Sequence, residues 1–187
     1  ELTLRKRDFS GFTLGGEIAL PITSRIEGSL DLGYSRSSKG SEFRHFTDTD
    51  NLPIEQTTTF ERVPVTANLR FNLVEPGRQI GRLAWIPSRV VPWVGGGAGF
   101  MWYRFQQEGD FVDFKTNNVF NATLSSDKFT PMVQGMAGVD FSLSPSIALT
   151  ADARYLAAKA DLTSDFSGYK PIDLSGVSMT LGLTFRM

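Results

Sequence analysis

Few residues of this chain could do chemistry, and each has a plainer explanation. The single histidine, His45, lies in a polar stretch, where a solvated side chain is far more common than a general base. Asp48, Asp50 and Glu55 could ligate calcium, but no glycine stands where an EF-hand loop requires one. The glycines in 95–99 lack the Lys-Ser/Thr pair that follows a phosphate-binding loop, and the chain has no cysteine. We therefore expect no enzyme, no catalytic residue, no metal site and no cofactor.

A different set of polar residues alternates with apolar ones along the chain. It comprises acidic residues and arginines, namely Glu17, Glu27, Asp31, Arg62, Arg70, Asp140, Asp152, Arg154 and Arg186. A buried charge without a partner costs several kcal/mol, so charges of both signs on one face of a sheet are expected to pair. We expect this set to form a network inside a barrel that is wide enough only for side chains, and so to plug it.

Hydrophobic periodicity predicts that strands carry these charges. Apolar residues recur at every second position, as in half-buried strands, and no convincing helix is found. From Val177 to Met187, for example, the odd-numbered residues are all apolar and the even-numbered ones are Ser, Thr, Gly or Arg. The predicted strands are Phe12–Leu20, Ile26–Tyr34, Val63–Phe71, Trp93–Arg104, Val133–Phe141, Ile147–Tyr155 and Val177–Met187. Pro64 lacks an amide proton and predicts a bulge near the end of its strand.

The connections between these strands are alternately short and long. Tight turns are predicted at 21–24 and 144–145, and long polar loops at 35–57, 106–128 and 161–175. This alternation is typical of an outer-membrane barrel, with turns in the periplasm and loops outside. The segment 75–89 lies at the turn end but is long and rich in arginine, so we expect a basic periplasmic insertion there.

Alternation alone does not separate a membrane barrel from a soluble lipocalin-like barrel with a ligand inside. Mid-strand charges with small residues between them favour a narrow polar lumen. Trp93 and Trp102 or Tyr103 are separated by about nine residues, roughly 30 Å of strand, which matches an apolar band between two aromatic girdles. We therefore interpret these three residues as membrane-interface aromatics. Trp93 and Trp102 differ in parity, so both face lipid only if a bulge lies between them.

Three segments carry a resemblance to a known family. The ending Thr-Leu-Gly-Leu-Thr-Phe-Arg-Met resembles the C-terminal insertion signal of outer-membrane proteins, with Gly182, Phe185 and Met187 at its defining positions. Met187 stands where a final Phe is commoner. Residues 91–99 and 133–141, the latter followed by Ala-Arg-Tyr at 153–155, resemble small outer-membrane barrels such as opacity proteins and OmpA-, OmpX- and OmpW-type barrels. The resemblance spans nearly the whole chain.

The resemblance implies one domain over residues 1–187, an all-β, antiparallel up-and-down transmembrane β-barrel of eight strands in a bacterial outer membrane. Only seven strands are evident, and bacterial single-chain barrels have even strand numbers. Counting back from Met187 leaves Phe12–Leu20 without an ascending predecessor, so we expect the first strand to be missing from this chain. The alternative is that residues 1–8 form it, although Arg5–Asp8 would be a poor lipid-facing segment.

The expected function is structural, anchoring or surface interaction through the long loops. The expected partners are outer-membrane lipid and lipopolysaccharide, the outer-membrane assembly machinery, and an extracellular or neighbouring membrane protein. The alternatives are a narrow OmpW-like channel for small or hydrophobic solutes and a soluble lipocalin-like ligand-binding barrel. A net charge of −1 and a pI near 5.9 give no basic excess, so nucleic acid is not an expected partner.

Overall fold

The computed structural model describes residues 11–47, 53–81, 84–113, 118–160 and 171–186. Its regular elements are the strands β1 (Thr13–Pro21), β2 (Ile26–Thr47), β3 (Pro53–Asn72), β4 (Gly77–Ile80), β5 (Ala84–Pro87), β6 (Val90–Asp113), β7 (Asn118–Ser142), β8 (Ile147–Ala160), β9 (Ile172–Asp173) and β10 (Gly176–Phe185). The prediction of an all-β chain is confirmed for these residues. The expectations for residues 1–8, Asp48, Asp50 and Met187 lie outside them.

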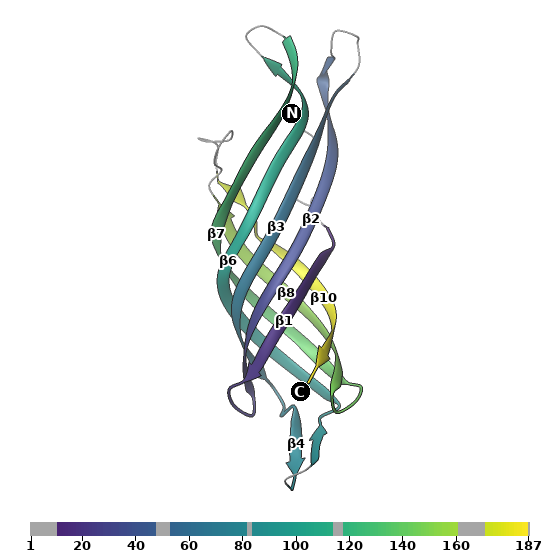
Figure 1. The fold of residues 1–187 in the computed structure, drawn as a ribbon, viewed down its shortest axis with the longest axis vertical. Helices are drawn as coiled ribbons and strands as arrows, with labels where there is room; N and C mark the ends of the chain where they lie inside the picture. Colours follow the sequence, from purple (N-terminus) through teal and green to yellow (C-terminus); the bar gives the residue numbers. More distant parts are fainter. Residues whose placement is uncertain (1–10, 48–52, 82–83, 114–117, 161–170, 187) are drawn as a thin grey trace.

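One strongly curved sheet contains the seven strands that the alternation predicts, in the order β1-β2-β3-β6-β7-β8-β10. Each pairing along this path is antiparallel, so the predicted up-and-down arrangement is confirmed. The short β9 pairs with β8, and β4 and β5 form a separate hairpin. In Figure 1 this hairpin and the tight turns lie at the lower end, here called the turn end, and the opposite end is called the loop end.

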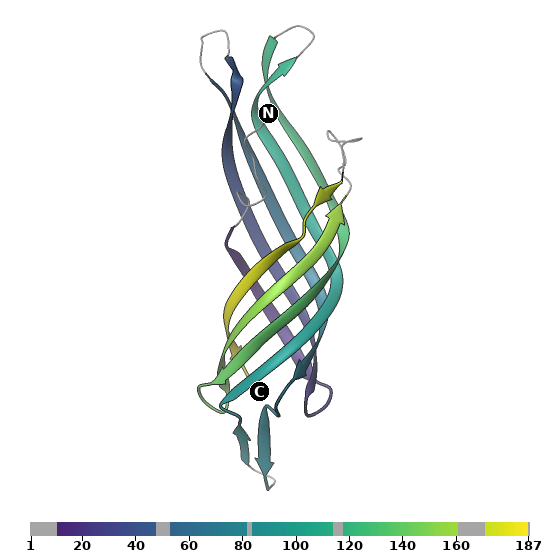
Figure 2. The same ribbon diagram turned by 180° about the vertical axis from the view of Figure 1, so that it is seen from behind.

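The two edges of the sheet are β1 and β10. Within the described part of the chain no backbone pairing joins them. Six antiparallel pairings separate the two strands, so β1 and β10 run in the same direction, toward the turn end. In Figure 2, β10, β8 and the lower parts of β7 and β6 cross in front, and β1, β2 and β3 lie behind them. The sheet therefore curves far enough to bring opposite walls face to face.

Four strands are much longer than predicted. The segments 35–57 and 106–128 are mostly strand, because β2 continues to Thr47, β3 begins at Pro53, β6 continues to Asp113 and β7 begins at Asn118. Their interpretation as long loops is wrong. Both faces of these extensions are largely polar. The apolar-polar alternation therefore ends where the extensions begin, although the backbone pairing continues. The extensions rise beyond β1, β8 and β10 in Figure 1.

Pro64 interrupts the pairing of β2 with β3 without the predicted bulge. The ladder omits Gly33 and Tyr34 but resumes at Ser35 in the same register, and the register irregularity lies further on, between Phe43 and Thr47. A Cβ atom at Gly33 would lie 3.0 Å from Pro64 Cγ. Because Gly33 has no side chain, the proline ring fits beside it, and the strand accommodates Pro64 without an extra, bulged residue.

The long extensions give a first testable prediction. Arg36, Lys39, Arg104 and Lys128 lie within paired strands. Proteases cleave locally unfolded segments, so we expect trypsin to leave these sites intact in the folded protein while it cleaves after Arg25 in the exposed turn. Mass spectrometry of a timed digest measures both rates, with the denatured chain as control. Cleavage after Arg104 as fast as after Arg25 would contradict the strand assignment.

Candidate functional site

The sheet separates two kinds of side chain onto its two faces. Large apolar side chains project from the convex outer face, where Leu30 is 64% and Phe100 62% exposed. Polar and charged side chains project from the concave inner face, where Asn68 and Asp140 are almost fully buried. Strict period-two alternation produces this separation because successive side chains of a strand point to opposite faces. The candidate site is the inner face and a cavity of about 2630 Å³ that lies against it and is open between the edge strands β1 and β10, which also line it.

Arg154 on β8 gathers three carboxylates from three strands. It pairs with Asp31 on β2, with Asp152 on its own strand at 2.7 Å, and with Glu17 on β1 at 3.3 Å. Its guanidinium donates through Nε, Nη1 and Nη2, so each nitrogen serves a different partner. Four of the predicted network residues are thus brought together, and the planar donor fork of arginine explains how one cation holds three acids.

Arg70 on β3 forms a second cluster toward the turn end. It pairs with Asp140 on β7 and, at 3.7 Å, with Glu27 on β2. Neutral side chains donate further hydrogen bonds to both carboxylates: Asn72 donates to Glu27 at 2.6 Å, and Thr150 donates to Asp140 at 2.9 Å. Ionised groups on a sheltered face need this degree of saturation, because each missing hydrogen bond adds a desolvation cost.

Trp93 belongs to this second cluster and does not face outward. Its side chain is 3% exposed, its indole Nε1 donates to Asp140 at 3.3 Å, and the Arg70 guanidinium lies 4.4 Å from its ring. A Cβ atom at Gly138 would lie 2.6 Å from this ring, so the neighbouring strand must carry glycine there. Tyr103 is fully buried on the same face. The interpretation of Trp93 and Tyr103 as membrane-interface aromatics is therefore wrong, since no bulge shifts their parity in the ladders of β6.

The remaining two arginines of the predicted network pair with no carboxylate in the described part of the chain. Arg62 donates from Nε to Ser35 at 3.2 Å, and its guanidinium lies 5.5 Å from the Phe60 ring. Arg186 donates to Ser142 at 2.9 Å and lies 5.5 Å from the ring of Trp85 in the β4–β5 hairpin. Seven of the nine predicted network residues thus form ion pairs, in two clusters of four and three residues and not in one network, and Arg62 and Arg186 pair with no carboxylate in the described residues.

An apolar cluster fills the inner face near the loop end. It contains Phe60, Met101, Tyr103, Met132, Ala158, Ala160 and Leu174, with Phe105, Leu156 and Ile172 packed against it. Ile172 and Leu174 lie at β9, in a stretch predicted to be loop, so sequence periodicity gave no signal for them. The inner face therefore changes from charged to apolar between the turn end and the loop end.

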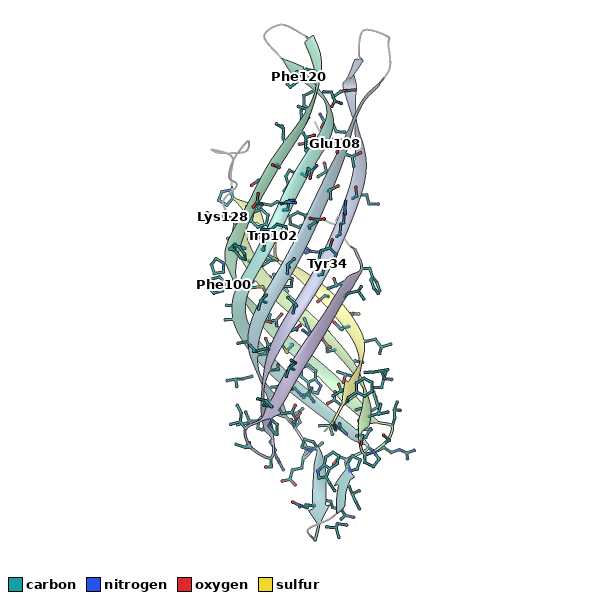
Figure 3. All side chains as sticks on the ribbon, viewed as in Figure 1. Tyr34, Phe100, Trp102, Glu108, Phe120 and Lys128 are labelled. Atoms are coloured by element: carbon teal, nitrogen blue, oxygen red, sulfur yellow. The ribbon has the colours of Figure 1, made fainter. Side chains whose placement is uncertain are left out.

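The outer face changes character at a single level. Trp102 lies opposite Val63 on one neighbouring strand and Phe129 on the other. The next outward row toward the loop end is charged on four adjacent strands, with Arg36, Glu61, Arg104 and Asp127. Arg36 pairs with Glu61 at 3.5 Å, and Arg104 lies 5.2 Å from the Trp102 ring. Figure 3 shows Phe100, Trp102 and Tyr34 below this level and Glu108 above it. An apolar band with an aromatic row thus ends at a charged row.

The predicted basic insertion is the β4–β5 hairpin at the turn end. Ser88 anchors it through its amide, which donates to the Pro76 carbonyl at 2.8 Å, and Ser142 donates to the Ser88 carbonyl at 2.8 Å. Gly81, with a φ of 65°, provides the reversal that favours glycine. Trp85 reaches from the hairpin to Arg186 and to the edge of the inner cavity. The hairpin therefore projects from the turn end, with Trp85 at its contact with the edge of the cavity (Figure 1).

The C-terminal strand has the surface that the resemblance implies. Val177, Met179, Leu181, Leu183 and Phe185 are all exposed on the outer face of β10, and Met179 is 85% exposed. Gly182 lies on the inner face opposite Thr150, with nothing within 4 Å of an added Cβ atom. The role of Gly182 and Phe185 as an insertion signal stays a prediction.

Comparisons with known proteins do not extend these observations. No protein-family model matches the chain, and no curated protein matches it. In the described residues, no group of three or more His, Cys, Asp or Glu side chains is placed to hold a metal ion. Nor does this part of the chain contain a helix of the length and apolarity needed to cross a membrane.

The second cluster gives a prediction about stability. Arg70→Met leaves the carboxylates of Glu27 and Asp140 without their cation, so we expect the free energy of unfolding to fall by about 3 kcal/mol. Arg36→Met breaks the exposed pair with Glu61 and is the matched control, with an expected loss below about 1 kcal/mol. Urea titrations followed by tryptophan fluorescence measure both. Equal losses for the two variants would show that the inner pairs are no stronger than surface pairs.

Proposed function

We propose that the chain is an integral outer-membrane β-barrel with a structural, anchoring or surface-interaction role, related to the small outer-membrane barrels that its motifs resemble. The observation that carries the proposal is the outer face, which is apolar from the turn end up to one aromatic and one charged row. Monomeric soluble proteins rarely expose an apolar patch of this extent. A lipid bilayer would cover it.

The height of the apolar band agrees with this proposal. On β6 the outward residues from Val90 to Trp102 are all apolar or glycine, and the next outward residue is Arg104. Twelve residue steps span about 40 Å of strand, which at a tilt of about 45° corresponds to roughly 28 Å of height. That is close to the thickness of the hydrocarbon region of a bilayer.

Closure of the barrel is part of the proposal. A membrane-spanning sheet cannot leave an edge in lipid, because unpaired backbone groups there cost several kcal/mol each. Since β1 and β10 run in the same direction, an antiparallel barrel requires one further strand between them, running from the turn end to the loop end. We propose that this eighth strand completes the barrel, in agreement with the even strand numbers of bacterial barrels.

The inner face argues against an open general pore. The clusters of Arg70 and Arg154 reach across the cavity from several strands, and the apolar cluster of Phe60 and Tyr103 lies above them. We propose that the barrel serves as an anchor, with lipid and lipopolysaccharide around its apolar band and the assembly machinery acting on β10. The long extensions of β2, β3, β6 and β7 replace the predicted loops as the surface for an extracellular or neighbouring membrane protein.

The proposal is tested first by folding and by lipid contact. We expect a β-rich species whose mobility on SDS gels differs between unboiled and boiled samples. In single-tryptophan variants reconstituted with brominated phospholipid, we expect quenching of Trp102, which faces outward, and little quenching of Trp93, which faces Asp140. A monomer that stays soluble without detergent and shows no quenching at Trp102 would favour the soluble lipocalin-like barrel instead.

Charge placement on one strand gives a second test. Leu30 and Ser38 lie on the outer face of β2, the former inside the apolar band and the latter beyond the charged row. Leu30→Arg places a charge near the middle of the bilayer and should lower the stability of the lipid-inserted form by about 3 kcal/mol. Ser38→Arg is the control and should change it by less than about 0.5 kcal/mol. Heat-dependent gel shifts in vesicles measure both, and equal effects would sink the proposed membrane boundary.

A further inference from the structure

Arg62 is one of two arginines of the inner cavity that pair with no carboxylate in the described residues; the other, Arg186, lies at the turn end. The contacts of Arg62 are the hydrogen bond from Nε to Ser35 and the Phe60 ring, and its two terminal nitrogens have no partner in the described part of the chain. The side chain is partly buried and lines the cavity. An unpaired cation in a sheltered position costs stability, and a bound anion removes that cost.

The charges of the inner face are segregated along its height. The acidic residues lie toward the turn end, where Arg154 and Arg70 already pair with them. Asp31 pairs in the ladder with Thr66, four residues from Arg62 along β3, which is about 13 Å. From Arg62 to the loop end, the inward positions of β2, β3 and β7 carry no carboxylate in the described residues; on β6, Asp113 shares the inward parity ten residues beyond Tyr103, and Asp173 of β9 lines the cavity.

The surroundings of Arg62 determine the rest of the ligand. The cavity wall beside it is apolar and is formed by Phe60, Met101, Phe105, Leu156 and Leu174. One free guanidinium balances one negative charge, and its planar pair of terminal nitrogens fits the two oxygens of a carboxylate. A phosphate monoester carries almost twice that charge and would lack a second close cation. The geometry suits a carboxylate attached to an apolar body.

We propose that the inner cavity binds an amphipathic monocarboxylate, with its carboxylate on the terminal nitrogens of Arg62 and its apolar body against the Phe60 and Leu174 wall. This site goes beyond the anchoring role. It lies on the inner face whether lipid or water surrounds the outer face. The inference therefore stands or falls separately from the membrane proposal.

The test is calorimetric titration of the folded chain in phosphatidylcholine nanodiscs with decanoate, with titration of empty nanodiscs subtracted. We expect saturable binding of one decanoate per chain. Acetate, which has the charge without the apolar body, and decyltrimethylammonium, which has the opposite charge, should bind at least about tenfold more weakly. If the chain folds as a soluble protein, the same titration is run in buffer.

Variants locate the site. Arg62→Gln should weaken decanoate binding about tenfold or more, because a charge-assisted bidentate contact is lost. Arg62→Lys retains the charge and should bind more tightly than Arg62→Gln. Arg36→Gln removes an outer-face arginine and should leave binding unchanged. Gel mobility of each unboiled variant checks its folding. Absence of saturable binding to the wild type, equal effects of Arg62→Gln and Arg36→Gln, or equal affinity for the trimethylammonium analogue would each overturn the proposal.

Discussion

The ion pairs of Arg154 depend on the curvature of the sheet and in turn hold it. Asp31 on β2 and Arg154 on β8 are four strand spacings apart in the order of the sheet, which is about 19 Å in a flat sheet. A guanidinium cannot span that distance, so the contact exists only because the sheet curls until β2 and β8 face each other. Glu17 on β1 extends the same contact to the edge strand. Loss of the arginine would leave three carboxylates converging on one face, where they would repel each other.

The same curvature explains how the two faces of the sheet can be so different. Small residues on the inner face of β6 allow the side chains of neighbouring strands to fill the concave side; a side chain at Gly97 would overlap Asn68, for example. Large residues on the convex side, such as Phe100 and Trp102, have space to diverge. A narrow charged interior and a broad apolar exterior are therefore one consequence of alternation on a curled sheet. Beyond Glu61 both faces of the strand extensions are largely polar, so apolar and polar residues no longer alternate along these strands.

The strand cores could be predicted from the sequence because each has one apolar and one polar face. Parity alone predicts that Arg70, Asp140 and Arg154 face inward, and all three lie on the inner face. Their pairing partners could not be derived, since alternation fixes which face a residue takes but not the register between strands. The spacing of Trp93 from Trp102 suggests a second outward aromatic row, but Trp93 faces inward and donates to Asp140. Parity is the better guide here, because Trp93 has the parity of Tyr103 and not of Trp102.

The gap between β1 and β10 has an electrostatic counterpart in the Arg154 cluster. The carboxylate on the edge strand is the most exposed: the side chain of Glu17 on β1 is 29% exposed, against 14% for Asp31 on β2 and 2% for Asp152 on β8, whose strands each lie one place in from an edge. Glu17 is thus the member of the cluster that solvent still reaches, and it lies on the edge strand. A strand placed beside β1 would shelter Glu17 to the degree that its partners already have. Such a strand would have to present small or polar residues inward, since Glu17 and Arg154 leave no apolar surface there for a large side chain to cover.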